Sequence, residues 1–335
     1  MCCCVLEPPR RRLPLARDRL PHARHELPYH VRPYDLAARC TILSPMTTVA
    51  FALVIASAIS HATWNFLLKR SNEKSAFLWS LGAVSFAVFL LPAVVSTYID
   101  GISARGAMFG AVSALLHGVY GLALCRGYQL GDLSAVYPIA RGMGPALIPI
   151  AAVLLLDERA SLAAGFGIAL VVLGIYAINI QGRSLRGLTQ PLRDLNRPAI
   201  RVAFLTGALI TAYSLWDKAA LDHLSPLTLN QFAITGWLLV LAPLAIRSSA
   251  QPVRSEWRER RGSMLAAGVL APLGYVLVLA ALTTSRISYI APAREVGIVL
   301  GAVLGVLFLG EGYGAWRILG SILILGGVLT LGLAP

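Results

Sequence analysis

The sequence predicts an all-α polytopic membrane protein with ten transmembrane helices arranged as two inverted five-helix repeats. Three observations predict this fold. Of the 335 residues, 57% are hydrophobic and only 13% are charged; ten long stretches carry almost no charge; and one part of the chain repeats the pattern of another. Soluble domains average about 45–50% apolar and about 25% charged residues. The composition therefore argues against a water-soluble enzyme.

Ten stretches are nearly free of Asp, Glu, Lys and Arg, and we expect each to cross the membrane as a helix. About 20 apolar residues cross a hydrocarbon layer of about 30 Å, and the backbone must satisfy its own hydrogen bonds there. The connections between them leave no room for an extramembrane catalytic domain. The stretches are 46–68, 75–99, 106–125, 133–156, 160–182, 202–221, 223–246, 262–285, 287–310 and 318–335.

The first 45 residues differ from the rest because they are rich in arginine and proline and contain no apolar run. We expect residues 1–45 to form a disordered basic tail, with Met46 as an alternative natural start. Four of the five cysteines lie in this tail, and no cysteine or histidine spacing suits a metal site. We therefore expect no metal and no cofactor, apart from a proton as coupling ion.

The chain carries a net charge of +13, from 29 Lys and Arg against 16 Asp and Glu. In a soluble protein this balance would suggest nucleic acid, but here the cations lie in short loops, where the positive-inside bias of membrane insertion explains them. We expect a small-molecule solute and the lipid bilayer of the cell membrane as partners, and no nucleic acid; a homodimer stays open. After residue 45, fifteen Lys and Arg lie in odd-numbered loops and four in even-numbered loops. This places the odd loops in the cytoplasm and both ends of residues 46–335 outside.

The fourth and fifth stretches repeat in the ninth and tenth. The first copy contains Ser134, Pro138, Arg141 and Glu158, and the second contains Ser288, Pro292, Arg294 and Glu311. From the arginine to the glutamate the spacing is 17 residues in both copies. Gly167 and Gly174 then match Gly320 and Gly327, and, more loosely, Trp64, Asn65 and Lys69 match Tyr213, Ser214 and Lys218. We infer two homologous units, 46–182 and 202–335, joined by a basic linker loop, 183–201.

Because five spans are an odd number, the second unit enters the membrane from the opposite side. An inverted repeat of this kind is the sequence signature of many secondary transporters. The alternative is a duplication that made a stable bundle without a transport role.

This order of motifs resembles the EamA-like transporter family of the drug/metabolite transporter superfamily. The resemblance rests on the ten spans, the two halves, and the duplicated Pro, Arg and Glu pattern, together with the segment from His61 to Asn65 in the first span. It covers residues 46–335. It implies a secondary transporter of a small polar metabolite, an amino-acid-like solute or a drug, often an exporter. It also implies cytoplasmic termini, against the loop charges.

Charged residues in the middle of two predicted helices are candidate substrate-binding residues. A charge at the centre of a spanning helix costs about 2.5–3.5 kcal/mol on insertion scales, so it should face a cavity or a partner. Arg141 lies in the fourth span, and Arg294 and Glu295 lie at matching depth in the ninth. Their net charge of +1 would suit a carboxylate-bearing or zwitterionic solute, or a cycle in which Glu295 binds and releases a proton. The alternative is an Arg141–Glu295 ion pair that only pins the two halves together.

Two pairs spaced i, i+4 could complete the substrate-binding cavity, with the histidine or the aspartate taking up a proton. His61 and Asn65 share one face of the first span, and Tyr213 and Asp217 repeat that spacing in the sixth. The alternative places Asp217 and its neighbour Lys218 at the lipid headgroups.

Prolines predict breaks in the same two spans that hold the central arginines. Pro138 and Pro145 in the fourth span and Pro292 in the ninth remove backbone hydrogen bonds, and freed carbonyls or half-helix ends could bind a solute or ion. An architectural role for these prolines stays open. Glu158 and Glu311 close their spans, and we expect them to serve as helix-end structure before any role as gates.

The sequence contains no catalytic or nucleotide-binding motif, and we expect no enzyme. Two alternatives from other classes remain. One is an intramembrane enzyme that uses His61 or His117 with a buried Ser or Asp, although we expect His117 to be a packing residue. The other is a non-transporting membrane scaffold or receptor.

Overall fold

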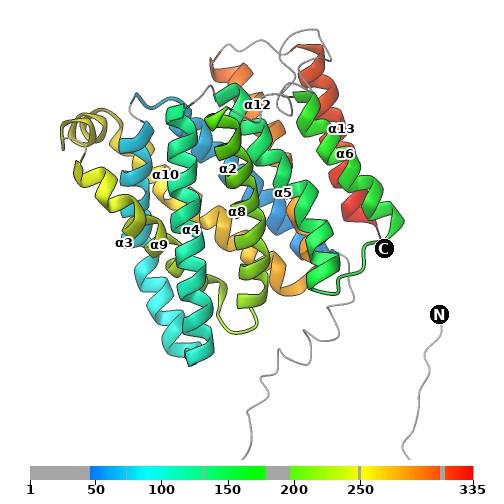
Figure 1. Ribbon diagram of the computed structural model, residues 1–335, viewed down its shortest axis with the longest axis horizontal. Helices are drawn as coiled ribbons and strands as arrows, with labels where there is room; N and C mark the ends of the chain where they lie inside the picture. The colour runs from blue at the N-terminus through cyan, green and yellow to red at the C-terminus, as the bar shows by residue number, and fades with distance from the viewer. Residues whose placement is uncertain are drawn as a thin grey trace, which may run out of the picture.

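The computed structural model describes residues 46–72, 74–130, 133–178, 197–247, 250–309 and 314–334. The predicted tail and most of the predicted linker lie outside these residues. The described part is all-helical and contains no strand (Figure 1). Its helices are α2 (Thr48–Lys69), α3 (Lys74–Asp100), α4 (Ala104–Leu130), α5 (Leu133–Leu155), α6 (Leu162–Ile178), α8 (Pro198–Ala220), α9 (Pro226–Arg247), α10 (Ala250–Thr284), α11 (Ile287–Ala293), α12 (Val296–Leu309) and α13 (Ala315–Leu333).

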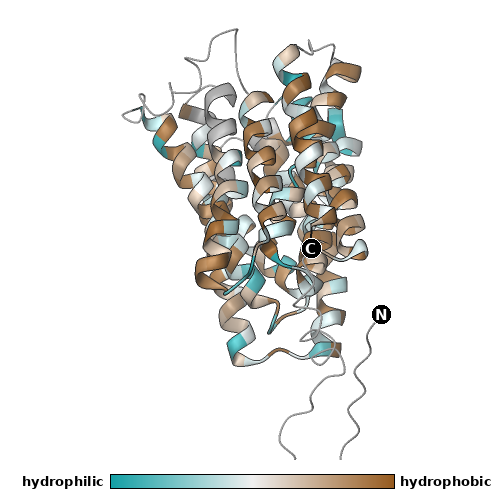
Figure 2. Ribbon diagram, turned by 90° about the vertical axis from the view of Figure 1, so that its right-hand side faces the viewer, coloured by the Kyte–Doolittle hydropathy of each residue, from teal (hydrophilic) through white to brown (hydrophobic). Residues whose placement is uncertain are grey.

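Each predicted span coincides with one helix, except the ninth, which is divided into α11 and α12. Among the described residues, seven helical segments are long and apolar enough to cross a membrane, and the apolar segments of α5 and α6 are shorter. Large apolar side chains cover the outside of the bundle; Leu91 and Leu154, for example, are 70% and 73% exposed. Apolar residues dominate the helices in Figure 2. Because only lipid would solvate such a surface favourably, the chain is an integral multi-pass membrane protein.

Helix ends follow local sequence signals. Thr47 precedes α2, and its side-chain oxygen accepts a hydrogen bond from the backbone N–H of Ala50 at 3.1 Å, which satisfies one of the free donors of the first turn. Pro198 begins α8, where its fixed φ suits the first turn and its missing N–H costs nothing. Helix α3 is followed by Gly101 at a φ of 71°, a left-handed conformation that glycine adopts without strain.

The helices pack in pairs that recur along the chain. α2 packs against α10 as α4 packs against α8, and α5 packs against α8 as α12 packs against α2. α9 contacts both α3 and α4, and α3 also contacts α10. The remaining large interface joins α6 to α13, which lie side by side at one edge of the bundle (Figure 1). Helices far apart in the sequence thus make most of the interhelical contacts.

Facing glycines form the close interface between α6 and α13. A Cβ atom added to Gly174 would lie 2.7 Å from the carbonyl oxygen of Gly320, and one added to Gly327 would lie 2.6 Å from that of Gly167. Because Gly167 faces Gly327 and Gly174 faces Gly320, the two helices run antiparallel. Small residues let helix backbones approach this closely in a membrane.

The ninth span is broken where the sequence predicts it, and the fourth is not. Pro292 lies in the last turn of α11, and a turn at Arg294 and Glu295 separates it from α12. Helix α5 continues from Leu133 to Leu155 through the positions of Pro138 and Pro145, so these prolines do not break it. Membrane helices tolerate proline because neighbouring helices, polar side chains and local adjustments satisfy the groups it frees. The predicted half-helix ends in the fourth span are therefore wrong.

Candidate functional site

An ion pair joins the two central charged positions across the bundle. The Nη2 atom of Arg141 on α5 donates to Oε2 of Glu295 at 3.0 Å. The Nε atom of Arg294 lies 3.8 Å from Oε1 of the same carboxylate. The side chain of Glu295 is only 1% exposed. One carboxylate thus lies between two cations, and the ion pair that the sequence left as an alternative is present.

The break between α11 and α12 positions Arg294 and Glu295. The backbone N–H of Glu295 donates to the carbonyl of Pro292 at 3.1 Å, and that of Ile298 donates to the carbonyl of Glu295 at 2.9 Å. These i to i+3 bonds satisfy backbone groups through the turn. The break therefore presents side chains to the interior, and its carbonyls are mostly not left free for a ligand.

A first cavity, cavity 1, lies between α2, α4, α5 and α8. Arg141 lines it together with Tyr120 of α4, and His61 and Asn65 of α2 lie on its wall. The Nδ1 atom of His61 accepts from Trp64 Nε1 at 3.2 Å, and the Asn65 amide nitrogen donates to the His61 carbonyl at 2.8 Å. The structure thus brings three predicted site residues to one cavity.

A second, smaller cavity, cavity 2, lies between α8, α10 and α11. Its polar wall is formed by Ser214 and Asp217 of α8, Tyr275 of α10 and Arg294. Apolar side chains of α10 and α11 form the rest of its lining. Cavity 2 therefore combines one carboxylate with one guanidinium, at a different place in the bundle from cavity 1.

Helix α8 lines both cavities. Ile210 lines cavity 1 and Ser214 lines cavity 2, and these residues are separated by about one helical turn, or about 6 Å along the axis. Cavity 1 lies toward the first half of α8 and cavity 2 toward its second half. Each cavity receives one of the two arginines that flank Glu295.

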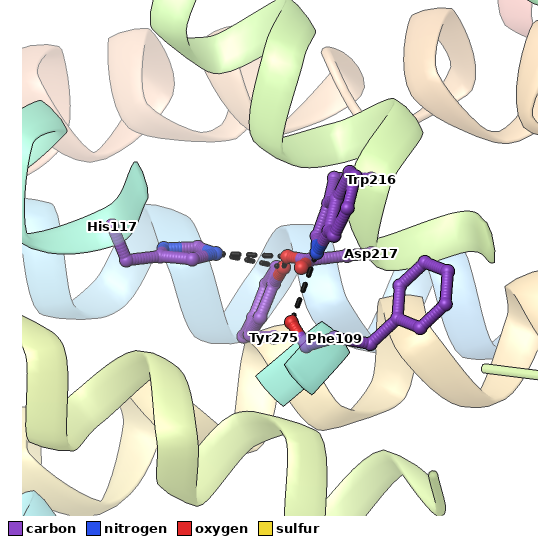
Figure 3. A network of polar contacts seen from close by, with 5 residues as sticks. All are labelled: Phe109, His117, Trp216, Asp217 and Tyr275. Carbon is purple, nitrogen blue, oxygen red and sulfur yellow. Dashed lines mark hydrogen bonds and ion pairs between the residues drawn. The ribbon is translucent and has the colours of Figure 1, made fainter. Parts of the chain in front are cut away.

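Asp217 lies in a buried polar network that joins three helices (Figure 3). Its Oδ2 atom is 2.8 Å from Nε2 of His117 on α4 and accepts a hydrogen bond from the hydroxyl of Tyr275 on α10. The same His117 nitrogen is 3.2 Å from the Tyr275 hydroxyl. Asp217 is 1% exposed. The alternative that placed this carboxylate at the lipid headgroups is therefore wrong.

The neighbours of Asp217 hold it in place. The ring of Tyr213 packs on His117 with 4.2 Å between centroids, so this predicted site residue supports the network. Trp216 Nε1 donates to the backbone carbonyl of Phe109 at 2.9 Å (Figure 3). Lys218 points to the end of α10, where Nζ donates to the carbonyls of Leu282 at 2.5 Å and Ser285 at 3.2 Å. A cation at a helix C-terminus is stabilised by the last free carbonyls and the helix dipole.

Glu158 caps the first turn of α11. Its Oε1 accepts from the backbone N–H of Ile287 at 2.9 Å, and its Oε2 accepts from the backbone N–H and the hydroxyl of Ser288 at 3.0 Å and 2.6 Å. A carboxylate at a helix N-terminus satisfies free donors and complements the dipole. The expectation of helix-end structure is confirmed for Glu158; Glu311 lies outside the described residues.

Sequence reasoning missed three residues that complete these sites: His117, Tyr275 and Tyr120. Each lies in an apolar run without a motif; His117 was expected to be a packing residue, or to act with a buried Ser or Asp in the enzyme alternative. Their partners are distant in the chain, so spacing alone could not reveal the contacts. Within the described part of the chain, no group of three or more His, Cys, Asp or Glu side chains could hold a metal ion.

Comparison with known proteins supports the fold and shows a family resemblance in the second half of the chain. One solved structure, described as "Crystal structure of protein", matches with a TM-score of 0.65 and 16% sequence identity over 84% of this chain and 95% of the other. No curated protein matches the chain. The sequence model of the EamA-like transporter family matches residues 197–333. Residues 197–333 are thus similar in sequence to the EamA-like transporter family.

Proposed function

We propose that the chain is a secondary transporter that moves a small polar solute across the cell membrane by alternating access, in the direction of export. The observation that carries the proposal is the position of Glu295 between two arginines, each of which lines a separate cavity. A buried charge cluster costs desolvation energy in a membrane protein. Two cavities adjoin that cluster, which supports a role for the buried charges in binding a solute.

The transporter is proposed to consist of two inverted five-helix repeats, 46–182 and 202–335. The recurring helix pairs support this division: when each helix of the first unit is exchanged for its counterpart in the second, α2 against α10 becomes α8 against α4. Under the same exchange, the contact between α5 and α8 becomes the contact of α11 and α12 with α2. The contact between α6 and α13 maps onto itself. Contacts that map onto themselves are expected of a pseudo-two-fold axis.

The same exchange relates the two cavities. Arg141 in cavity 1 corresponds to Arg294 in cavity 2, and Asn65 corresponds to Ser214; each cavity also has one tyrosine in its lining, Tyr120 of α4 in cavity 1 and Tyr275 of α10 in cavity 2. Because the repeats are inverted, counterpart cavities would open to opposite faces of the membrane. This correspondence is what alternating access requires of a carrier with a site near the midplane.

Solute binding is proposed to compete with the ion pair. In the present structure Glu295 is bound to Arg141 and lies farther from Arg294, so Arg294 is the cation more available to a ligand. A solute carboxylate in cavity 2 would bind Arg294, and a shift of Glu295 from Arg141 to Arg294 would release the solute and expose Arg141 to the other side. A carboxylate-bearing or zwitterionic solute, such as an amino-acid-like metabolite, fits this exchange. Glu295, His61, Asn65, Tyr213 and Asp217 complete the proposed site.

Counterflow in proteoliposomes tests the proposal. Vesicles are loaded with one unlabelled compound from a panel of amino acids, dicarboxylates and cationic drugs, and entry of the same labelled compound is followed. We expect counterflow of at least one compound, and loss of most of it in Arg141→Ala, Arg294→Ala and Glu295→Gln. The exposed Arg105 provides a control in Arg105→Ala. Unchanged rates in all three site variants would overturn the site. A turnover product without flux would point to an intramembrane enzyme, and neither flux nor product to a scaffold or receptor.

A further inference from the structure

Cavity 2 contains a carboxylate with an unused oxygen. The Oδ1 atom of Asp217 is fully buried and has no hydrogen-bond partner among the described residues, while Oδ2 contacts both His117 and Tyr275. A buried, incompletely paired carboxylate is costly unless it binds a proton or a ligand. Asp217 also lines cavity 2, so water or a solute in that cavity can reach it.

We propose that Asp217, with His117 and Tyr275, is a proton-binding site through which a transmembrane pH difference drives solute movement; this rests on the transport function proposed above. His117 and Asp217 are in direct contact at 2.8 Å. The pair can therefore bind and release one proton while Tyr275 keeps the carboxylate in position.

The network joins the two proposed repeats. His117 lies on α4 in the first unit, whereas Asp217 and Tyr275 lie on α8 and α10 in the second. Protonation of Asp217 removes the charge that attracts His117 and so weakens a contact between the units. A proton entering from cavity 2 thereby favours rearrangement of the units, and its release on the other side restores the contact.

The charge of Asp217 affects solute binding because other charged groups lie near it. Arg294, from the α11–α12 turn, shares cavity 2 with Asp217, and Glu295 lies next to it. Arg141, from α5, lines cavity 1, and Lys218 on α8 itself bonds to the end of α10. When Asp217 is charged it offsets Arg294; when Asp217 is neutral, cavity 2 is more positive. Proton binding and solute binding in this cavity are therefore linked, and each changes the other's affinity by the same factor.

The proposed proton-binding carboxylate belongs to cavity 2 and has no counterpart among the described residues of cavity 1. By the pairing of Asn65 with Ser214, the position of the first unit that corresponds to Asp217 is Leu68, which is buried and apolar. The described residues that line cavity 1 include no carboxylate. This asymmetry lets a proton act on one of two otherwise related cavities, while the pH difference sets the direction of net transport.

Proton-driven accumulation tests the proposal in proteoliposomes, using the panel compound with the fastest counterflow. A pH difference of about one unit is about a tenfold ratio of proton activity, so a carrier that couples one proton to each solute holds about a tenfold solute gradient. We expect this accumulation in the wild type under one polarity of the pH difference. We expect Asp217→Asn to lose accumulation under both polarities, and any counterflow it keeps should no longer change with pH. The exposed Asp222 provides a matched control, because Asp222→Asn should accumulate as the wild type does. Equal accumulation in Asp217→Asn and the wild type, or no response of the wild type to pH, would overturn the proposal.

Infrared difference spectroscopy of the purified chain in lipid nanodiscs tests the same site without a solute. On acidification the wild type should show the C=O band of a protonated carboxyl that is missing in Asp217→Asn and retained in Asp222→Asn. Tyr275→Phe removes one hydrogen bond and leaves the carboxyl in place, so it should shift the midpoint of the band and keep its amplitude. If Asp217→Asn retains the full band, the proton site is wrong whatever the flux assay gives. If the band depends on Asp217 but no compound shows counterflow, the transport function fails and the proton site stands.

Discussion

Arg141 and Glu295 are 154 positions apart in the sequence, yet Nη2 of one lies 3.0 Å from Oε2 of the other in the middle of the bundle. The arginine comes from the continuous helix α5 and the glutamate from the break between α11 and α12. The contact therefore joins the first proposed repeat to the second. It also separates the wall of cavity 1 from the arginine that lines cavity 2.

Removal of Glu295 should destabilise the chain more than removal of Arg141. Arg141→Met leaves Glu295 beside Arg294 at 3.8 Å, whereas Glu295→Gln leaves two buried guanidinium groups without their carboxylate. Breaking a buried pair by removing one partner costs about 3–5 kcal/mol. The double variant should cost less than the sum of the two, with a coupling of about 0.5–3 kcal/mol for residues in contact. Reversible unfolding in detergent micelles measures the cycle. Strictly additive losses would mean that the two side chains do not interact.

Loss of the α11 cap should weaken the half-helix that ends at the central arginine. Glu158→Ala leaves the backbone N–H groups of Ile287 and Ser288 without their acceptor, and we expect a loss of about 0.5–2 kcal/mol. Glu158→Gln keeps one acceptor oxygen and should lose less. Unfolding of the two variants in the same detergent checks the order. If Glu158→Gln is the less stable of the two, the carboxylate does not act as a cap.

Adding even one methyl group at the interface of α6 with α13 should lower the stability of the chain. In Gly174→Ala or Gly320→Ala the new Cβ would lie less than 3.0 Å from a backbone oxygen of the facing helix, and such overpacking costs about 1–3 kcal/mol. Gly165 on the same helix has open space around it. Gly165→Ala should therefore be neutral, or stabilising by up to about 1 kcal/mol from helix propensity. Thermal unfolding of the three variants compares them, and equal midpoints would exclude close packing at these glycines.

Composition and charge spacing were sufficient to predict the helices, because a bilayer imposes both the length and the apolarity of each span. The depth of Arg141, Arg294 and Glu295 predicted that they would need partners, and the structure supplies them. The sequence could not give the partner of Asp217. An ion pair of this type depends on which helix faces which, and that information lies in the packing of α4 against α8 rather than in local spacing.

The proline prediction shows the same limit. Pro292 and Pro145 have equal effects on the backbone in isolation, yet only the span that contains Pro292 is divided. Contacts with neighbouring helices and local backbone adjustments decide whether a proline-containing helix stays continuous. No local pattern around Pro145 carries that information.

Substituted-cysteine labelling tests most directly the claim that the two cavities open to opposite faces of the membrane. Asn65→Cys in cavity 1 and Ser214→Cys in cavity 2 are made in a chain whose native cysteines are replaced by serine, and a membrane-impermeant thiol reagent is added to one face at a time. We predict that Asn65→Cys reacts from the face of the odd-numbered loops and Ser214→Cys from the other face. Reaction of both cysteines from the same face would contradict alternating access through these cavities.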